Sequence, residues 1–155
     1  MRELLPEVRA RVFPVGRLDY HSSGLLLLTN DGELALRLTH PRYGVRKTYR
    51  VKVSGRPTAE ALEKLARGVD LEEGTTGPAD VRLIRSGDAK TWLEITLSEG
   101  RKHEVRRLCE HVGYRVEKLT RVRLGPLSLG SLQAGQHRAL AEREVHELRR
   151  AVGLE

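Results

Sequence analysis

The stretch GRLDYHSSGLLLLTND, residues 16–31, places an aspartate, Asp19, just ahead of four consecutive leucines. The leucines predict a short buried strand, and the Thr-Asn-Asp after them predicts the turn that ends it. Gly16 and Gly24 allow tight backbone paths around the acid. Apolar neighbours would partly desolvate its carboxylate, while a guanidinium such as that of Arg17 would hold it ionised. This setting suits a nucleophile, and the alternative is an ordinary turn aspartate that pairs with Arg17 or caps backbone amides.

The composition indicates a globular protein with a basic surface. The chain has 155 residues, of which 39% are hydrophobic and 32% charged, and this length suits a single domain. Lysine and arginine exceed acidic residues by 28 to 21, so the net charge of +7 favours a polyanionic partner, most simply nucleic acid. Residues 1–13 are too charged for a secretory signal, and no apolar run approaches membrane-spanning length, so we expect a cytoplasmic protein.

The cysteine and histidine residues of the sequence give little indication of a disulfide or a metal site. Cys109 is the only cysteine, which excludes an intrachain disulfide and suits a reducing compartment. The histidines are scattered, and neither a CxxC nor an HExxH motif occurs. We therefore expect no metal site.

Helical and strand patterns alternate along the rest of the chain. Period-two patterns predict a strand at 47–55, a hairpin over 79–100 and a returning strand over 114–129, and helical periodicity predicts helices over 31–40, 58–69, 101–113 and 141–152. Several strand pairs have short connections, which favours an α+β fold with a mixed, mainly antiparallel sheet flanked by helices over a doubly wound parallel one. No repeat, low-complexity stretch or linker interrupts residues 1–155, so we expect one domain.

Residues 42–56, RYGVRKTYRVKVSGR, carry six basic side chains and no acid. Interleaved tyrosines favour RNA, because aromatic rings can stack on unpaired bases. A solvated edge strand protected by lysines is the alternative. Tyr49 shares a strand face with Val51 and Val53, so its ring either lines a pocket or belongs to the core. The RNA-contact candidates of this segment are Arg46, Lys47 and Arg50.

The segment RKHEVRRLCEHVG, residues 101–113, has a second group of basic side chains. Arg106 adjoins the apolar stripe of the expected helix, from where it could reach a carboxylate or a phosphate. His103, at the start of the helix, fits a cap or a phosphate contact better than a general acid or base. Cys109 lies on the stripe and is expected in the core. The RNA-contact candidates here are Arg101, Lys102, His103 and Arg107, and ordinary solvated surface charges are the alternative.

Taken in order, several segments resemble the ribosomal-RNA pseudouridine synthases of the RsuA/RluB type. The resemblance runs from about residue 16 to residue 148, and it is carried by GRLDYHSSGLLLLTNDGELALRLTHP, KTYRVKVSG, GVDLEEGTTGPADV, SEGRKHEVRRLCEHVGYRVEKLTRVRLGPLSL and GQHRAL. It implies an α+β catalytic domain without metal or organic cofactor that isomerises a uridine of ribosomal RNA to pseudouridine. We expect a large-subunit RNA target, ribosomal RNA or an assembling subunit as partner, and a monomer that does not bind membranes.

The resemblance also implies roles for single residues. The catalytic aspartate of the Gly-Arg-Leu-Asp motif falls on Asp19, with Arg17 beside it as a substrate contact. The base-stacking tyrosine falls on Tyr49, and the basic residue that pairs with the aspartate falls on Arg106.

The sequence also departs from the family pattern. Family members usually have a Lys-Pro-x-Gly strand before the Gly-Arg-Leu-Asp motif, and a small RNA-binding domain before that strand. Neither is found in residues 1–15. Glu104 stands where the family often has glutamine, which would alter the local hydrogen bonding or charge. A non-catalytic RNA-binding module for ribosome assembly, which keeps the fold and the basic face, is the alternative function.

Overall fold

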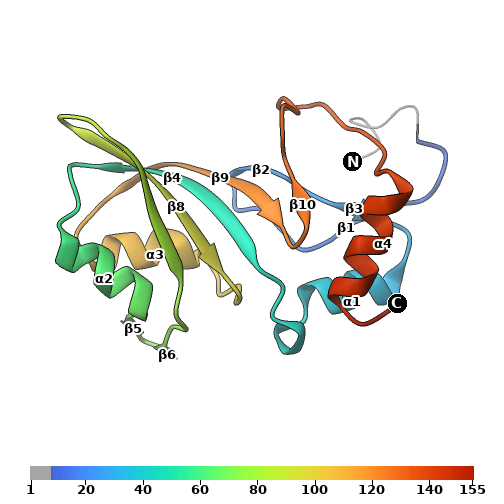
Figure 1. Cartoon of the computed structure of the whole chain (residues 1–155), viewed down its shortest axis with the longest axis horizontal. Helices are drawn as coiled ribbons and strands as arrows, with labels where there is room; N and C mark the ends of the chain where they lie inside the picture. The colour runs from blue at the N-terminus through green and yellow to red at the C-terminus, as the bar shows by residue number, and fades with distance from the viewer. Residues whose placement is uncertain (1–7) are drawn as a thin grey trace.

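A six-stranded sheet forms the centre of the chain in the computed structural model, which describes residues 8–155 (Figure 1). The strand order is β10-β9-β4-β8-β7, all antiparallel, and β2 lies parallel beside β9. The charged residues 1–13, from which we expected no secretory signal, lie partly outside the described residues. The strands of this sheet are β2 (Ser23–Gly24), β4 (Lys47–Ser54), β7 (Asp80–Ser86), β8 (Lys90–Leu97), β9 (Val116–Leu124) and β10 (Leu127–Ser128).

Helices and two short strand pairs complete the fold. The pair β1 with β3 lies near the start of the chain, and the pair β5 with β6 follows the second helix. These strands are β1 (Phe13–Pro14), β3 (Leu28–Thr29), β5 (Asp70–Leu71) and β6 (Gly74–Thr75); the helices are α1 (Gly32–Thr39), the 3₁₀ helix η2 (Pro41–Tyr43), α2 (Ala59–Arg67), α3 (Glu104–His111) and α4 (Glu142–Ala151).

The first hydrophobic core lies between the sheet and helices α2 and α3, which share one side of it (Figure 1). Val51 and Val53 of β4 are fully buried there, because alternate residues of a strand point to the same face. Leu65 of α2 and Leu108 of α3 pack against them. Tyr49 belongs to the same face of β4 and lies at the edge of this core.

A second core forms where α1 and α4 meet the other end of the sheet (Figure 1). Asp31 caps α1 by accepting a hydrogen bond from the amide of Leu34 at 3.1 Å. The second Asp31 oxygen accepts from Arg149 of α4 at 3.1 Å, so one carboxylate both caps α1 and ties α4 to it. Leu148 of α4 is buried in this core beside Leu34.

The predicted α+β fold with a mixed, mainly antiparallel sheet is confirmed, as are the hairpin and the helices. The predicted buried strand over the four leucines is wrong. Residues 25–27 are not in a strand, and Leu27 alone of the run is buried. The chain changes partner here, since β2 pairs with β9 whereas β3 pairs with β1. A segment that moves between two sheets cannot keep one ladder, so Leu25 and Leu27 reach the second core from irregular backbone. Within residues 8–155 no helix is long and apolar enough to cross a membrane.

Candidate active site

The loop that carries Asp19 is fixed at both ends by glycines. Gly16 has φ +74° and Gly24 has φ +111°, conformations in which other residues are strained. A turn closes between them, where the Ser22 amide donates to the Asp19 carbonyl at 2.9 Å. The side chain of Asp19 remains 33% exposed. The prediction that glycines allow a tight path around a partly dry carboxylate therefore agrees with the structure.

Strand β2 attaches this loop to β9. Its two residues pair in parallel with Thr120 and Arg121, and the Ser23 hydroxyl lies 3.0 Å from that of Thr120. Just beyond, the Leu25 amide donates to the carbonyl of Arg121 at 2.8 Å. The Arg121 Nε returns a hydrogen bond to the Leu25 carbonyl at 2.9 Å. Asp19 is thus placed by a loop that is bonded to β9 on its C-terminal side.

Arg121 is a functional candidate that the sequence analysis missed. Only 4% of the residue is exposed, and its Nη2 has no hydrogen-bond partner among the described residues. A buried guanidinium with an unpaired nitrogen is unusual, because a buried charge needs partners. The signal was present in the strand pattern: Arg121 follows Leu119 at a spacing of two, which places it on the inward face of β9.

Tyr49 meets Arg121 across the sheet, since the two residues are partners in the β4–β9 register. Burial raises the pKa of the Tyr49 phenol, the charge and hydrogen bond of Arg121 oppose that rise, and the nearby carboxylates of Asp19 and Glu104 add to it. The phenol is therefore in its neutral form at neutral pH. The charges of Arg121 and Asp19 both act on the Tyr49 phenol, which places the three side chains in one neighbourhood. The sequence left open whether Tyr49 lines a pocket or belongs to the core, and in the structure its partly buried side chain packs against the first core.

His103 approaches Asp19 from the start of α3. It is the residue before the helix and has φ +53°, the only positive φ among described residues other than glycine. Its Nε2 lies 3.5 Å from Asp19 Oδ1, close enough for an ion pair when the imidazole is protonated. The sequence suggested a cap or phosphate contact for His103, and no side-chain capping bond is formed.

The expected pair between Arg106 and Asp19 is not formed in this structure. Arg106 instead donates to the carbonyl of His21 at 3.3 Å and to that of Val116 at 3.4 Å. These bonds connect α3 to the Asp19 loop through its backbone. Arg106 thus reaches the loop two residues beyond the aspartate, at a main-chain carbonyl, whereas the resemblance implied a pair with the carboxylate itself.

The other expected RNA contacts divide into two groups. Three of the arginines form ion pairs within the chain: Arg46 with Asp80, Arg107 with Glu73, and Arg101 with Glu99 and Glu104. Arg17, Arg50 and Lys102 are exposed and, within residues 8–155, none of them forms an ion pair.

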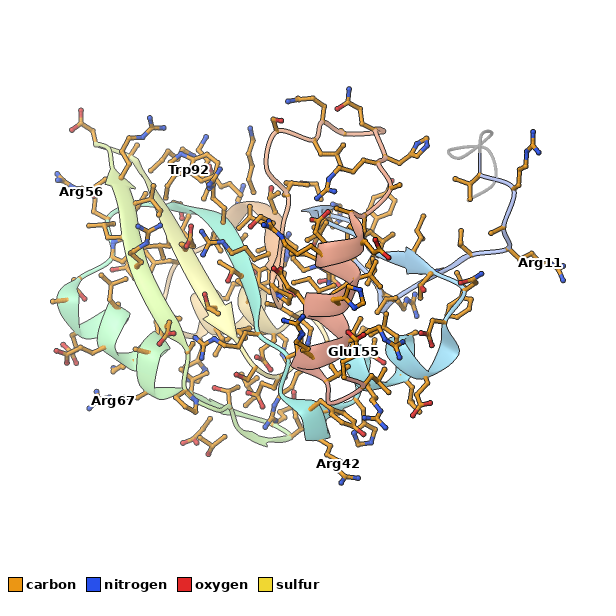
Figure 2. The ribbon with its side chains drawn as sticks, turned by 45° about the vertical axis from the view of Figure 1, so that its right-hand side comes forward. Arg11, Arg42, Arg56, Arg67, Trp92 and Glu155 are labelled. Carbon is orange, nitrogen blue, oxygen red and sulfur yellow. The ribbon has the colours of Figure 1, made fainter. Side chains whose placement is uncertain are left out.

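Position in the fold separates these candidates further. Arg50 follows Tyr49 in β4, so it lies on the opposite face of the sheet and does not join the Asp19 cluster. Lys47 lies on the Tyr49 face, where burial and then the charge of Arg121 lower its pKa while Glu104 raises it. Further basic side chains, Arg42, Arg56 and Arg67, extend outward from the ribbon (Figure 2).

The cluster combines an aspartate, an aromatic ring and a buried positive charge. A carboxylate held beside a ring can act on a planar base stacked there, and the guanidinium can balance negative charge as it develops. Among the described residues no group of three potential metal ligands occurs. Groups of these kinds suit covalent or proton-transfer chemistry on a flat substrate.

Comparison with known proteins gives the family. The family model for RNA pseudouridylate synthases matches residues 2–111. An uncharacterized RNA pseudouridine synthase of Aquifex aeolicus (strain VF5) is 46% identical over 154 residues, which are 99% of this chain and 62% of the relative. Ribosomal large subunit pseudouridine synthase B of Bacillus subtilis (strain 168) is 46% identical over 149 residues, 95% of this chain and 61% of the relative.

A solved structure agrees with these relatives. A crystal structure of a pseudouridylate synthase superposes with a TM-score of 0.79 at 34% identity and covers 88% of this chain and 59% of the other. The chain therefore belongs to the RNA pseudouridylate synthase family, and the predicted family is confirmed. It spans about three fifths of the length of the two curated relatives named above.

Proposed function

We propose that the chain isomerises a uridine of ribosomal RNA to pseudouridine, with Asp19 as its catalytic residue. The observation that carries this proposal is that Asp19 lies on a loop bonded to β9 at Arg121, which is the register partner of Tyr49. Family membership supports the reaction class. The names of several relatives support ribosomal RNA as substrate, and large-subunit RNA in particular. We propose that the chain acts on such an RNA as a monomer.

The reaction needs the target base outside its stack. Extruding a nucleotide costs about a few kcal/mol, which contacts to the flanking RNA offset. Exposed cations such as Arg17 and Lys102 are suited to hold the phosphates around the target. The ring of Tyr49 then offers a surface on which the extruded uracil stacks, next to the Asp19 carboxylate.

Asp19 promotes the cleavage of the bond between uracil N1 and ribose C1′. Its carboxylate does so by attacking the sugar, by attacking the base, or by removing a sugar proton, and all three require a carboxylate directed at the extruded nucleotide. The detached uracil turns and bonds to C1′ through C5. The C5 proton leaves and N1 gains a proton, so the product has the same composition as the substrate. Arg121 is placed to balance charge on the detached uracil.

Tritium release tests the proposal. RNA transcribed with 5-tritiated uridine loses tritium to water only when C5 becomes the glycosidic carbon. We expect the parent chain to release tritium, Asp19→Asn to release none, and the control Asp88→Asn, at the exposed tip of the β7–β8 hairpin, to match the parent. Circular dichroism would show that both variants fold. No release by the parent from naked ribosomal RNA or assembling subunits, with RNA binding intact, would contradict catalysis and leave a non-catalytic RNA-binding module.

A further inference from the structure

Glu104, the first residue of α3, is a buried carboxyl group that the proposed mechanism does not use. Only 4% of the residue is exposed. Its Oε1 accepts a hydrogen bond from the Arg101 amide at 3.3 Å, and its Oε2 is buried without a hydrogen-bond partner among the described residues. A buried carboxylate with one unpaired oxygen is costly, so the protonated form of this group is favoured in the folded chain.

A second carboxylate lies beside it. Glu99 accepts from the Gly77 amide at 2.7 Å through Oε1, and its Oε2 lies 3.5 Å from the Nε of Arg101. The same Nε lies 3.7 Å from Glu104 Oε1. Arg101 also donates to the Thr75 carbonyl at 2.9 Å. One guanidinium therefore serves two carboxyl groups, and a proton on Glu104 balances the charge.

The charges around Glu104 agree with this assignment. Burial, then the charge of Glu99, raises the pKa of Glu104 to about 7, although the bond from the Arg101 amide and the charge of Arg101 oppose the rise. From β4, Lys47 and Tyr49 face the same region, and Glu104 raises the pKa of both. The charge of Arg121 of β9 acts on both of these β4 residues, so cations are present, yet they do not supply the hydrogen bond that Oε2 lacks.

Glu104 is connected to the Asp19 site through a short turn. The Glu104 amide donates to the Arg101 carbonyl at 3.1 Å, and the Glu104 carboxyl accepts from the Arg101 amide, so the two residues bond reciprocally. His103 lies within this turn at φ +53°, with its Nε2 3.5 Å from Asp19 Oδ1. A left-handed backbone is strained for histidine, and such strain persists only where the surrounding bonds enforce it.

We propose that Glu104 is a positioning residue, which in its protonated form closes the turn over residues 101–104 and holds His103 against Asp19. When the proton is lost, two carboxylates share one guanidinium inside a poorly solvated turn, and the turn loosens. His103 then leaves Asp19, and turnover falls. The catalytic part of this inference rests on the proposed function, whereas the proton on Glu104 is independent of it.

The first measurement is the pH dependence of kcat in the parent, in Glu104→Gln and in Glu104→Ala, with Glu110→Gln on the exposed face of α3 as control. The parent and the control should lose activity, by about tenfold, as the pH rises through about 7. Glutamine keeps an oxygen for the Arg101 amide and cannot ionise, so Glu104→Gln should stay active without this alkaline decline. Alanine opens the turn and should be slow at every pH. A Glu104→Gln variant with the same alkaline decline as the parent overturns the proposal.

The second measurement is thermal unfolding, which needs no RNA. The pKa of Glu104 is raised from its ordinary value of 4.5 to about 7 in the folded state. Between these two pH values the folded chain therefore keeps a proton on Glu104 that the unfolded chain has already released. The parent should therefore lose stability across that window, and the Tm of Glu104→Gln relative to the parent should rise with pH. A pH-independent Tm difference overturns the proposal. A parent without activity would refute the proposed function, and a rising Tm difference would then still support the protonated turn.

Discussion

Gly24 lies directly against the main chain of Arg121. A Cβ atom at position 24 would overlap the Arg121 carbonyl oxygen and lie 2.6 Å from the Arg121 amide nitrogen, and the φ of Gly24 is +111°. Strands β2 and β9 can pair this closely because position 24 has no side chain. The contact fixes the end of the loop that carries Asp19, so one glycine sets the position of the aspartate relative to the buried guanidinium.

We expect Gly24→Ala to impair stability and catalysis together. The methyl group must displace backbone, and the positive φ adds strain, so the free energy of unfolding should fall by about 1–3 kcal/mol. Turnover should fall by about a hundredfold, because the Asp19 loop shifts from β9. Thermal unfolding and tritium release measure the two effects. Gly32→Ala is the matched control, since a Cβ at position 32 meets nothing within 4 Å. Equal behaviour of the two variants would contradict the role given to Gly24.

Arg121→Lys is expected to lower activity although it keeps the positive charge. Lysine lacks the Nε that bonds the Leu25 carbonyl at 2.9 Å, and its ammonium cannot reproduce the planar fork of the guanidinium. Turnover should fall by about tenfold or more, with a loss of stability of about 1–2 kcal/mol for the lost charged hydrogen bond. Arg123→Lys, at an exposed position of the same strand, serves as control. Full activity of Arg121→Lys would show that charge alone suffices at this position.

Tyr49→Phe should affect kcat more than KM. Phenylalanine keeps the ring on which the base is proposed to stack, so RNA affinity should stay within about threefold of the parent. It loses the hydroxyl, on which the charges of Arg121 and Asp19 act, so turnover should fall by about tenfold or more.

Tyr49→Ala completes this test, because it also removes the ring and should raise KM.

Since burial raises the pKa of Tyr49 above its ordinary value of 10.0, the phenol remains protonated at neutral pH and adds no pH dependence there. Steady-state kinetics of both variants would decide the assignment, and a purely KM-based defect in the phenylalanine variant would contradict it.

Cys109 should resist alkylation as long as α3 stays docked. The residue is fully buried, and burial, with a smaller contribution from Glu110, raises the pKa of its thiol to about 12. The thiolate, which is the reactive form, is therefore scarce and inaccessible. Iodoacetamide should not modify the native chain at neutral pH and should modify it fully in denaturant, as mass spectrometry would show. Rapid labelling of the native chain would mean that α3 opens readily.

Local sequence patterns were sufficient to predict most of the helices and strands. The alternation of Tyr49, Val51 and Val53 predicted both the strand and its buried face, because strand periodicity depends only on nearest neighbours. Helical spacing likewise predicted a helix over residues 31–40, and α1 confirms it. The leucine run misled this reasoning, since residues 25–27 pass from one sheet to another and no local pattern records a change of partner.

The sequence by itself determined the family, the basic character of the chain, most of its helices and strands, and the candidate Asp19 on a glycine-bounded loop. The tertiary structure decided which groups surround that aspartate. It brought His103 rather than Arg106 to the carboxylate, and it buried Arg121 against Leu25. These groups lie far apart in the chain and meet only when β2 docks on β9 and α3 packs on the sheet. Their distances depend on long-range packing, which residue spacing along the chain does not encode.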